Sequence, residues 1–303
     1  MSVLVVGSIA LDDIKTPQDE RKDLLGGSAS YGAVAASFFS PVKMVGIVGE
    51  DFPEAHIELM RSRGIDLEGL QIAKGKTFRW PGEYLGDMNT RETRSIALNV
   101  FEAFRPDLPE GYRNTPIVLL ANIAPDLQHL VLDQVDSPRF VIADTMDLWI
   151  NIARERLLEL LPRVDLLILN DGEARQLTGE DNLIRAGRAL QVLGPRFVAV
   201  KKGEHGCLLF GEGTEIFACP AYPLDEILDP TGAGDTFAGG LAGHLATAGP
   251  SGIGFPALRE AIIRGTVLAS FNVEEFSLER LKTLDRSQVE KRLASYRKIA
   301  ALA

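Results

Sequence analysis

Short apolar runs alternate with longer helical patterns along this 303-residue sequence, and this order leaves few folds open. The runs are rich in Val, Ile and Leu, as expected for strands that are buried on both faces of a sheet. They are Val3–Val6, Met44–Val48, Ile117–Leu120, Phe140–Ala143, Leu166–Leu169 and Phe197–Val200. The helical patterns are Gly32–Phe39, Glu54–Gly64, Ala153–Arg163 and Asn182–Gly194. The alternation predicts an α/β fold with a mainly parallel sheet covered by helices on both sides.

One segment, residues 75–104, interrupts the alternation because it carries no helical stripe. Within it, Ser95–Phe101 alternates like a strand with one covered face, and Gly86–Asn89 has the composition of a turn. We predict an antiparallel β excursion that forms a lid, with residues 11–25 as a further candidate segment; a surface hairpin is the alternative. The length suits one large domain, so residues 1–303 are expected to form a single domain with this lid.

Composition argues against several kinds of partner. The formal net charge is −10, whereas nucleic-acid binding needs a basic face. No apolar run approaches the roughly 18 residues that span a membrane. The apolar first residues lack a basic segment and a cleavage site, so they are interpreted as a buried strand. Cys207 and Cys219 are too few for a disulfide framework, which favours reduced thiols in a cytoplasmic protein.

The stretch Asp229–Gly240, DPTGAGDTFAGG, combines glycines with two aspartates. It follows a strand-like segment, Glu226–Leu228, and small and apolar residues continue it at helical density. Gly232, Ala233 and Gly234 are therefore predicted at a helix N-terminus, where unpaired N–H groups and the positive dipole end favour an anion. Glycines also let a phosphate approach the backbone closely. The stretch thus predicts a phosphate site.

Asp235 follows these glycines directly, although a carboxylate repels a phosphate. Its position is explained if it accepts a proton from the hydroxyl group that attacks the phosphate. The alternative is a glycine-rich turn in which Asp235 caps the helix. A dinucleotide fingerprint would need glycine where Phe237 stands, and no G-x-x-x-x-G-K-[ST] loop occurs. The four histidines have no metal-binding spacing.

At these residues the sequence resembles the ribokinase-like (PfkB) family of sugar and nucleoside kinases. The family's signature is close to D-T-x-G-A-G-D, and Asp229–Asp235 matches it except at Pro230. Further motifs occur in the family's order: GSIALD at Gly7–Asp12, GGSASYGAVAAS at Gly26–Ser37, GIVGED at Gly46–Asp51, NDGE at Asn170–Glu173 and KKGEHG at Lys201–Gly206. The resemblance therefore covers most of the chain, from Gly7 to about Asn272.

The resemblance implies a doubly wound three-layer α/β/α sandwich with a small β lid. It also implies an ATP-dependent kinase that uses Mg²⁺. Asp235 would be the catalytic base. Gly232, Ala233 and Gly234 would form the anion hole that stabilises charge on the transferring phosphoryl group.

For the nucleotide, the resemblance implies that Asn170 and Glu173 hold the Mg²⁺-bound phosphates, with Glu173 acting on the metal through water. Lys202, Gly203 and Gly206 would line the ATP site. From the residues alone, Asn170 and Glu173 fit a helix cap and its capping-box partner equally well. Both interpretations stay open at this point.

For the acceptor, the resemblance implies that Asp12, Gly26 and Gly27 hold substrate hydroxyl groups. Tyr31 stands where the family often has a sugar-binding Asn. A tyrosine can stack on a sugar or a base, or it can pack inward. Asp12 has an alternative role as the cap of the turn after the first strand.

Asp229 and Thr231 match two ligands of the monovalent cation, K⁺, that some members bind. A plain turn residue is the alternative for Asp229 before its proline. Lys201 and Lys202 replace a small polar pair of the family. They either bring a second positive charge to the phosphates or leave one lysine in solvent.

The expected function is transfer of the γ-phosphoryl group of ATP to a hydroxymethyl group of a small sugar or sugar-like substrate. A nucleoside kinase is the alternative, because the excursion carries polar and aromatic side chains that suit a ribosyl group or a base. They are Phe78, Trp80, Tyr84, Asp87, Asn89, Arg91 and Arg94. The same side chains suit a homodimer formed through the lid. A non-catalytic nucleotide-binding regulator is the alternative from another class, and the presence of Asp235 argues against it.

Overall fold

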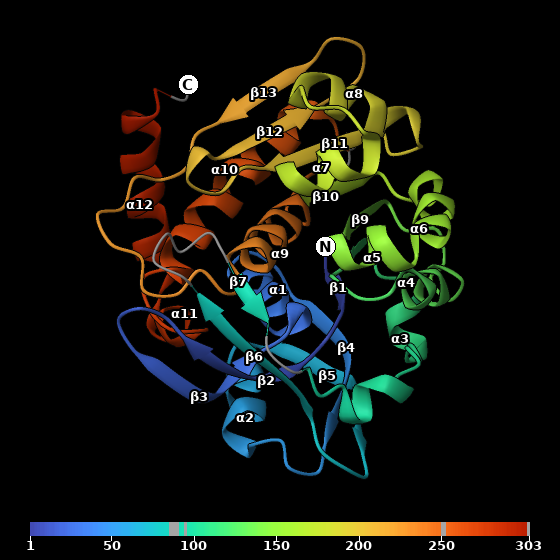
Figure 1. Ribbon diagram of the computed structural model, residues 1–303, viewed down its shortest axis with the longest axis vertical. Coiled ribbons are helices and arrows are strands. Elements are labelled where there is room, and N and C mark those ends of the chain that lie inside the picture. The colour runs from blue at the N-terminus through green and yellow to red at the C-terminus, as the bar shows by residue number, and fades with distance from the viewer. Residues whose placement is uncertain (85–90, 94–95, 250–252, 302–303) are drawn as a thin grey trace.

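A nine-stranded sheet runs through the computed structural model, which describes residues 1–84, 91–93, 96–249 and 253–301 (Figure 1). The strand order is β13-β12-β11-β10-β9-β8-β1-β4-β5. The strands are β1 (Val3–Val6), β4 (Val42–Gly49), β5 (Ile65–Ala73), β8 (Ile117–Leu120), β9 (Phe140–Asp144), β10 (Leu166–Asn170), β11 (Phe197–Lys201), β12 (Cys207–Phe210) and β13 (Ile216–Cys219). The strands from β11 to β5 are parallel, while β12 and β13 pair antiparallel at one edge.

Helices cover both faces of this sheet, because the strands are apolar on both sides. Val3 and Val5 of β1 face one core, whereas Leu4 and Val6 face another. The first face is covered by α1 (Ser28–Ser37), α2 (Glu54–Ser62), α9 (Ala233–Leu245), α10 (Phe255–Asn272), α11 (Glu279–Thr283) and α12 (Arg286–Ile299). The other face is covered by α3 (Glu110–Arg113), α4 (Pro125–Leu132), α5 (Asp147–Ile152), α6 (Arg154–Leu160), α7 (Asp171–Thr178) and α8 (Leu183–Val192). Short 3₁₀ turns are η1 (Asn99–Ala103), η2 (Leu161–Arg163) and η3 (Gly203–His205).

A second, four-stranded sheet has the order β3-β2-β6-β7. Its strands are β2 (Ala10–Lys15), β3 (Glu20–Gly26), β6 (Phe78–Tyr84) and β7 (Arg91–Thr93). β2 pairs antiparallel with β3 and β6 with β7, but β2 and β6 are parallel. The sheet therefore joins strands from both segments that the sequence singled out. It crosses the lower part of the molecule below α9 (Figure 1).

Two predicted strands are wrong. Ser95–Phe101 does not form a strand in its described part: Ala97 makes an isolated bridge, and η1 begins at Asn99. The Phe101 ring stacks on Phe78 at 5.4 Å between centroids, so this segment is held by aromatic packing. Glu226–Leu228 is also irregular, because it packs beside the end of α10. The predicted turn at residues 86–89 lies outside the described residues.

The α/β class and the doubly wound arrangement are confirmed. From β1 the chain proceeds to β4 and β5 on one side of the sheet, and later to β8 and β9 on the other. The order therefore reverses at β1, and ligands of such sheets bind outside the carboxyl ends of the strands at this point. None of the described helices combines the length and apolarity needed to cross a membrane.

Candidate active site

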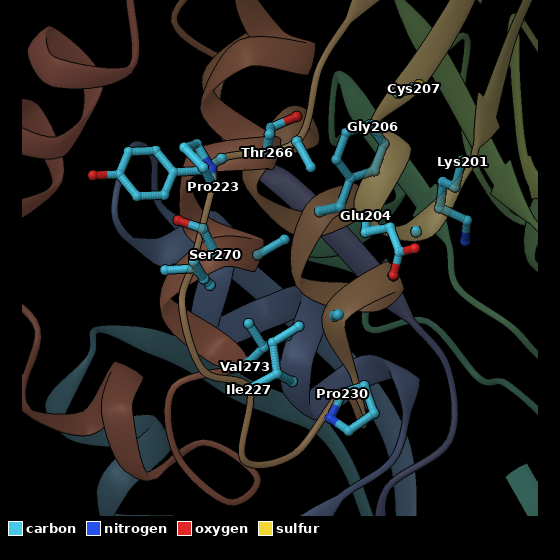
Figure 2. Close-up of a pocket in the computed structure, with 18 residues that line it drawn as sticks. Lys201, Glu204, Gly206, Cys207, Pro223, Ile227, Pro230, Thr266, Ser270 and Val273 are labelled. Carbon is cyan, nitrogen blue, oxygen red and sulfur yellow. The ribbon is translucent and has the colours of Figure 1, made fainter. Parts of the chain in front are cut away.

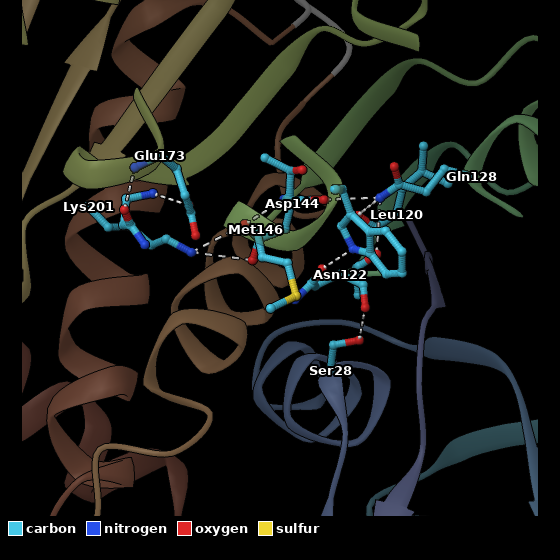
Figure 3. A network of polar contacts seen from close by, with 12 residues as sticks. Ser28, Leu120, Asn122, Gln128, Asp144, Met146, Glu173 and Lys201 are labelled. Carbon is cyan, nitrogen blue, oxygen red and sulfur yellow. Dashed lines mark hydrogen bonds and ion pairs between the residues drawn. The ribbon is translucent and has the colours of Figure 1, made fainter. Parts of the chain in front are cut away.

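Three polar residues stand at the carboxyl ends of neighbouring parallel strands, at one edge of the main sheet. Asp144 ends β9, Asn170 ends β10 and Lys201 ends β11. Asn170 and Lys201 are register partners. Because parallel strands bring their carboxyl ends to the same edge, these side chains gather there (Figure 3).

The N-terminus of α9 lies beside this edge. Gly232 caps the helix with a φ of 73°, a left-handed conformation that favours glycine. A Cβ on Gly232 would lie 2.3 Å from the Tyr31 ring, and a Cβ on Gly234 would lie 3.0 Å from the Lys201 Nζ. The first turn of α9, which also contains Ala233 and Asp235, is thus packed between these two side chains. Asp235 is partly exposed.

A cavity of about 490 Å³ opens next to this turn (Figure 2). Its lining includes the helix residues Ala233 and Gly234, together with Lys201, Gly203 and Gly206 from the β11–β12 connection. Apolar walls come from other segments, among them Leu224, Ile227, Phe237 and Val273. Lys202, which the sequence analysis assigned to the nucleotide, is not among the lining residues. Its neighbour Lys201 lines the cavity instead.

Asn170 and Glu173 form a capping box at the start of α7. The Asn170 Oδ1 accepts the Glu173 N–H at 2.8 Å, and the Glu173 Oε2 accepts the Asn170 N–H at 2.7 Å. The capping box, which was the alternative interpretation of these two residues, is therefore present. It uses only one oxygen of Glu173, so the other oxygen is left for another partner. Burial raises the pKa of Glu173 to about 7, although the Lys201 charge lowers it.

Lys201 and Asp144 form a buried ion pair that the sequence analysis did not identify. The Lys201 Nζ lies 3.2 and 3.3 Å from the two Asp144 oxygens (Figure 3). Burial opposes the charge on Lys201, but Asp144, and then Glu173 and Asp235, raise its pKa. The place of Asp144 at the carboxyl end of a predicted parallel strand was the signal that could have found it.

The predicted acceptor residues lie where β2, β3 and α1 meet. Asp12 is 2% exposed, and its Oδ1 has no hydrogen-bond partner among the described residues. A Cβ on Gly26 would lie 2.0 Å from the Asp12 carboxyl carbon, so this carboxyl group lies over the glycine. Gly27 has a φ of 90° and caps α1. Burial raises the pKa of Asp12 well above its usual range, and the charges of Asp229 and Asp235 add to this.

Tyr31 packs inward. It is 1% exposed within the main core, and its hydroxyl group has no hydrogen-bond partner in the described part of the chain. Burial raises the pKa of the phenol well above its usual range, with the charges of Asp12 and Asp229 contributing. The sequence left open whether Tyr31 stacks on a ligand or packs inward, and in the structure it packs inward.

Asp229 and Thr231 connect α9 with the second sheet. The Asp229 carboxylate accepts the N–H groups of Thr231 and Ser277, each at 2.8 Å. The Thr231 hydroxyl group donates to the Tyr84 hydroxyl of β6 at 3.0 Å. Asp229 thus makes the turn-type bond that was its alternative interpretation. Asp87, Asn89 and Arg94 of the predicted excursion lie outside the described residues.

The comparisons with known proteins identify a phosphotransferase that uses an alcohol group as acceptor. The doubly wound sheet and the glycine-capped helix agree with this class. The model of the pfkB family of carbohydrate kinases matches residues 131–282. The chain belongs to this family.

Individual relatives agree with this assignment. The chain is 30% identical to a cytidine kinase of Thermococcus kodakarensis over 252 residues, which are 80% of this chain and 88% of that protein. The structure of Arabidopsis thaliana ribokinase with ribose and ATP has a TM-score of 0.75 and 25% identity, and covers 96% of this chain and 98% of its own. A Methanocaldococcus jannaschii nucleoside kinase has the same fold with a TM-score of 0.75 and 20% identity, and covers 97% of this chain and 98% of its own.

Proposed function

We propose that the protein transfers the γ-phosphoryl group of ATP, as its Mg²⁺ complex, to the hydroxymethyl group of a ribosyl substrate. Ribose and cytidine, the substrates in the names of the relatives, share this group. The nucleotide would occupy the cavity beside α9, with its base against the apolar walls and its phosphates at Gly232–Gly234.

The observation that carries the proposal is the buried Asp12 Oδ1, which has no hydrogen-bond partner among the described residues. A buried polar group without a hydrogen bond is costly, so such a group in a native protein calls for a ligand. Asp12 is close enough to Asp235 for their charges to interact. A substrate hydroxyl group held by Asp12, with Gly26 and Gly27 around it, would bring the neighbouring reacting oxygen toward Asp235 at the N-terminus of α9.

Asp235 then acts as the base that accepts the proton of the attacking hydroxyl group. The N–H groups of Gly232 and Gly234 stabilise the developing charge on the phosphoryl oxygens. The Ala233 N–H donates to the Pro230 carbonyl oxygen at 3.2 Å, so it would have to be shared with the phosphoryl group. Catalysis consists mainly of positioning and charge neutralisation.

Mg²⁺ would be held by the nucleotide phosphates and by few protein groups, as its strong hydration favours. Glu173 has a carboxylate oxygen that the capping box does not use, and it would act on the metal through water. Asn170 fixes Glu173 in place through the capping box.

We further propose that K⁺ binds near Asp229 and Thr231, although both Asp229 oxygens also accept backbone N–H groups. Equal turnover in KCl and in tetramethylammonium chloride would remove K⁺ from the mechanism.

A nucleoside kinase is the second candidate, and the 30% identity to a cytidine kinase favours it. The inward packing of Tyr31 removes one argument for it, since that ring cannot stack on a base. We also propose that the second sheet closes over the substrate and excludes water. Its outer strands β3 and β7 have edges that could pair in a homodimer. Light scattering would give that oligomeric state.

A coupled ADP-release assay with Mg-ATP against ribose, other sugars, cytidine and other nucleosides tests the function. We expect turnover with one ribosyl compound and none in the Asp235→Asn variant. Turnover with cytidine but not ribose would select the nucleoside kinase. ATP binding without turnover on any acceptor would contradict the proposal and favour a nucleotide-binding regulator.

A further inference from the structure

Lys201 places a positive charge beside the N-terminus of α9. A Cβ on Gly234 would lie 3.0 Å from the Lys201 Nζ, so the ammonium group lies against the first turn of α9. The aligned peptide dipoles make that end of the helix positive. Lys201 and the helix end would repel each other without the carboxylates of Asp144, Glu173 and Asp235, which raise the pKa of Lys201.

Asp144 holds Lys201 in this position. The Lys201 Nζ lies within 3.3 Å of both Asp144 oxygens. Asp144 is itself fixed, since its Oδ1 accepts the Thr145 N–H at 3.0 Å and its carbonyl oxygen accepts from the Gln128 Nε2 at 3.0 Å (Figure 3). The Asp144 side chain is 5% exposed, so the pair is shielded from solvent.

The remaining donors of Lys201 face the cavity. An ammonium group has three N–H donors, and one carboxylate does not use all of them. The Lys201 side chain is 21% exposed, and it lines the cavity together with Gly203 and Gly234 (Figure 2). The positive end of α9 and the Lys201 ammonium group thus border the same cavity. An anion in that space would be stabilised by both.

We propose that Lys201 binds the terminal phosphates of the nucleotide, and that Asp144 is its positioning residue. This inference rests on the proposed function, since it assumes a nucleoside triphosphate in the cavity. In the reaction, the bond between the γ-phosphorus and the bridging oxygen of ADP breaks, and a bond to the acceptor oxygen forms. The acceptor's proton passes to Asp235, while Lys201 keeps its proton and neutralises charge on the phosphates.

Calorimetric titrations with ATP, AMP and adenosine, all with Mg²⁺, test the proposal in Lys201→Met. A lost charge-assisted hydrogen bond should weaken ATP binding about 10- to 100-fold. Binding of AMP and adenosine should change far less, because they lack the terminal phosphates. Lys298→Met removes an exposed lysine of α12 by the same substitution and should bind all three as the wild type does. Equal losses for all three ligands, or no loss for ATP, would overturn the proposal.

Lys201→Met leaves Asp144 buried without its partner, and this can impair folding. The double variant Lys201→Met/Asp144→Asn removes both charges and should fold while showing the same selective loss for ATP. Wild-type protein that binds no nucleotide would refute the proposed function itself. Wild-type protein that turns over ATP, with a double variant of unchanged ATP affinity, would refute only the role of Lys201.

A double-mutant cycle tests the positioning role of Asp144. Asp144→Asn should weaken ATP binding when Lys201 is present, but should add no further loss in Lys201→Met. Equal losses in both backgrounds would make Asp144 independent of Lys201 and overturn this part. Lys202→Met should weaken ATP binding less than Lys201→Met does, because Lys202 does not line the cavity. A larger loss there would transfer the role to Lys202.

Discussion

The ring of Tyr31 lies directly against Gly232, so that a Cβ at position 232 would be 2.3 Å from the Tyr31 Cε1. This contact joins α1, which follows the Gly26–Gly27 pair, to the cap of α9. The loop that is proposed to stabilise the phosphoryl group is therefore shaped by a side chain of the main core. The left-handed backbone at Gly232 requires glycine, and so does this close packing.

Gly232→Ala should lower both stability and turnover. An alanine at a φ of 73° costs about 1–2 kcal/mol, and the overlap with Tyr31 costs about 1–3 kcal/mol more. Gly213→Ala is the matched control, since Gly213 has a φ of 58° but no atom within 4 Å of its Cβ position. Denaturant unfolding and ADP release measure the two effects. If the two variants lost the same free energy of unfolding, the overlap with Tyr31 would not contribute to the loss.

Tyr31→Phe should retain turnover and keep or gain stability. It removes a buried hydroxyl group that has no hydrogen-bond partner among the described residues, and an unmade bond of this kind costs about 1–3 kcal/mol. The aromatic packing against Gly232 is preserved. Urea unfolding and steady-state kinetics check this, with Tyr31→Ala as the variant that empties the site. A large rise in KM for the acceptor in Tyr31→Phe would instead place the hydroxyl group on the substrate.

Asp235→Asn should keep the fold and nucleotide binding but lose turnover by about 100-fold or more, as expected when a general base is removed. Single-turnover kinetics with saturating ATP separate this effect from binding. Asn keeps the size of the side chain in the first turn of α9, which Gly232 caps without a side-chain hydrogen bond. Unchanged turnover would therefore contradict the role of Asp235 as the base.

Six strands of the main sheet were predictable because each contains a short apolar run, whereas β5, β12 and β13 were not identified from the sequence. Val3–Val6 and Ile117–Leu120 have the predicted bounds, and Phe140–Ala143 is extended only by the polar Asp144. The segments of the second sheet were identified, but the strand predicted at Ser95–Phe101 was wrong. There the stacking of Phe101 on Phe78 overrides the local alternation of apolar and polar residues. Such contacts between distant segments leave no periodic signal in the sequence.

The glycine-rich helix start was also predictable, since glycines followed by small apolar residues leave few other structures. The choice between Lys201 and Lys202 was not predictable. β11 ends at Lys201, whereas Lys202 caps the 3₁₀ turn η3, and the sequence does not show where the strand ends. The inward packing of Tyr31 likewise depends on α9 lying against α1.

Acid should destabilise the protein partly through His244. Burial, together with the charge of Arg264, lowers the pKa of His244 to about 4 from its usual value of 6.5. The unfolded chain therefore binds a proton more readily, and the stability that His244 contributes above pH 6.5 is lost as the pH falls toward 4. His244→Gln should flatten the decline in unfolding free energy over this window. His205→Gln, at a side chain that is 76% exposed, should leave the decline unchanged.

Glu173→Gln should raise the Mg²⁺ concentration needed for half-maximal turnover by about 10-fold or more, the usual cost of losing an outer-sphere partner of a metal. Gln can still accept the Asn170 N–H, so the capping box that starts α7 is retained and a loss of fold is not expected. Asp171→Asn is the control, because Asp171 lies in the same first turn but pairs with Arg175 away from the cavity. An unaltered Mg²⁺ titration in Glu173→Gln would reduce this residue to its capping role.

The same variant should change how stability depends on pH, in the opposite sense to His244. Burial raises the pKa of Glu173 to about 7 in the folded protein from its usual value of 4.5, so the folded state binds the proton more tightly. The unfolding free energy should therefore decrease as the pH rises from 4.5 to 7, when only the unfolded chain ionises readily. Glu173→Gln cannot ionise and should lack this decrease. Thermal unfolding without Mg²⁺ across that range measures the difference, and parallel curves for the two proteins would mean that Glu173 titrates normally in the fold.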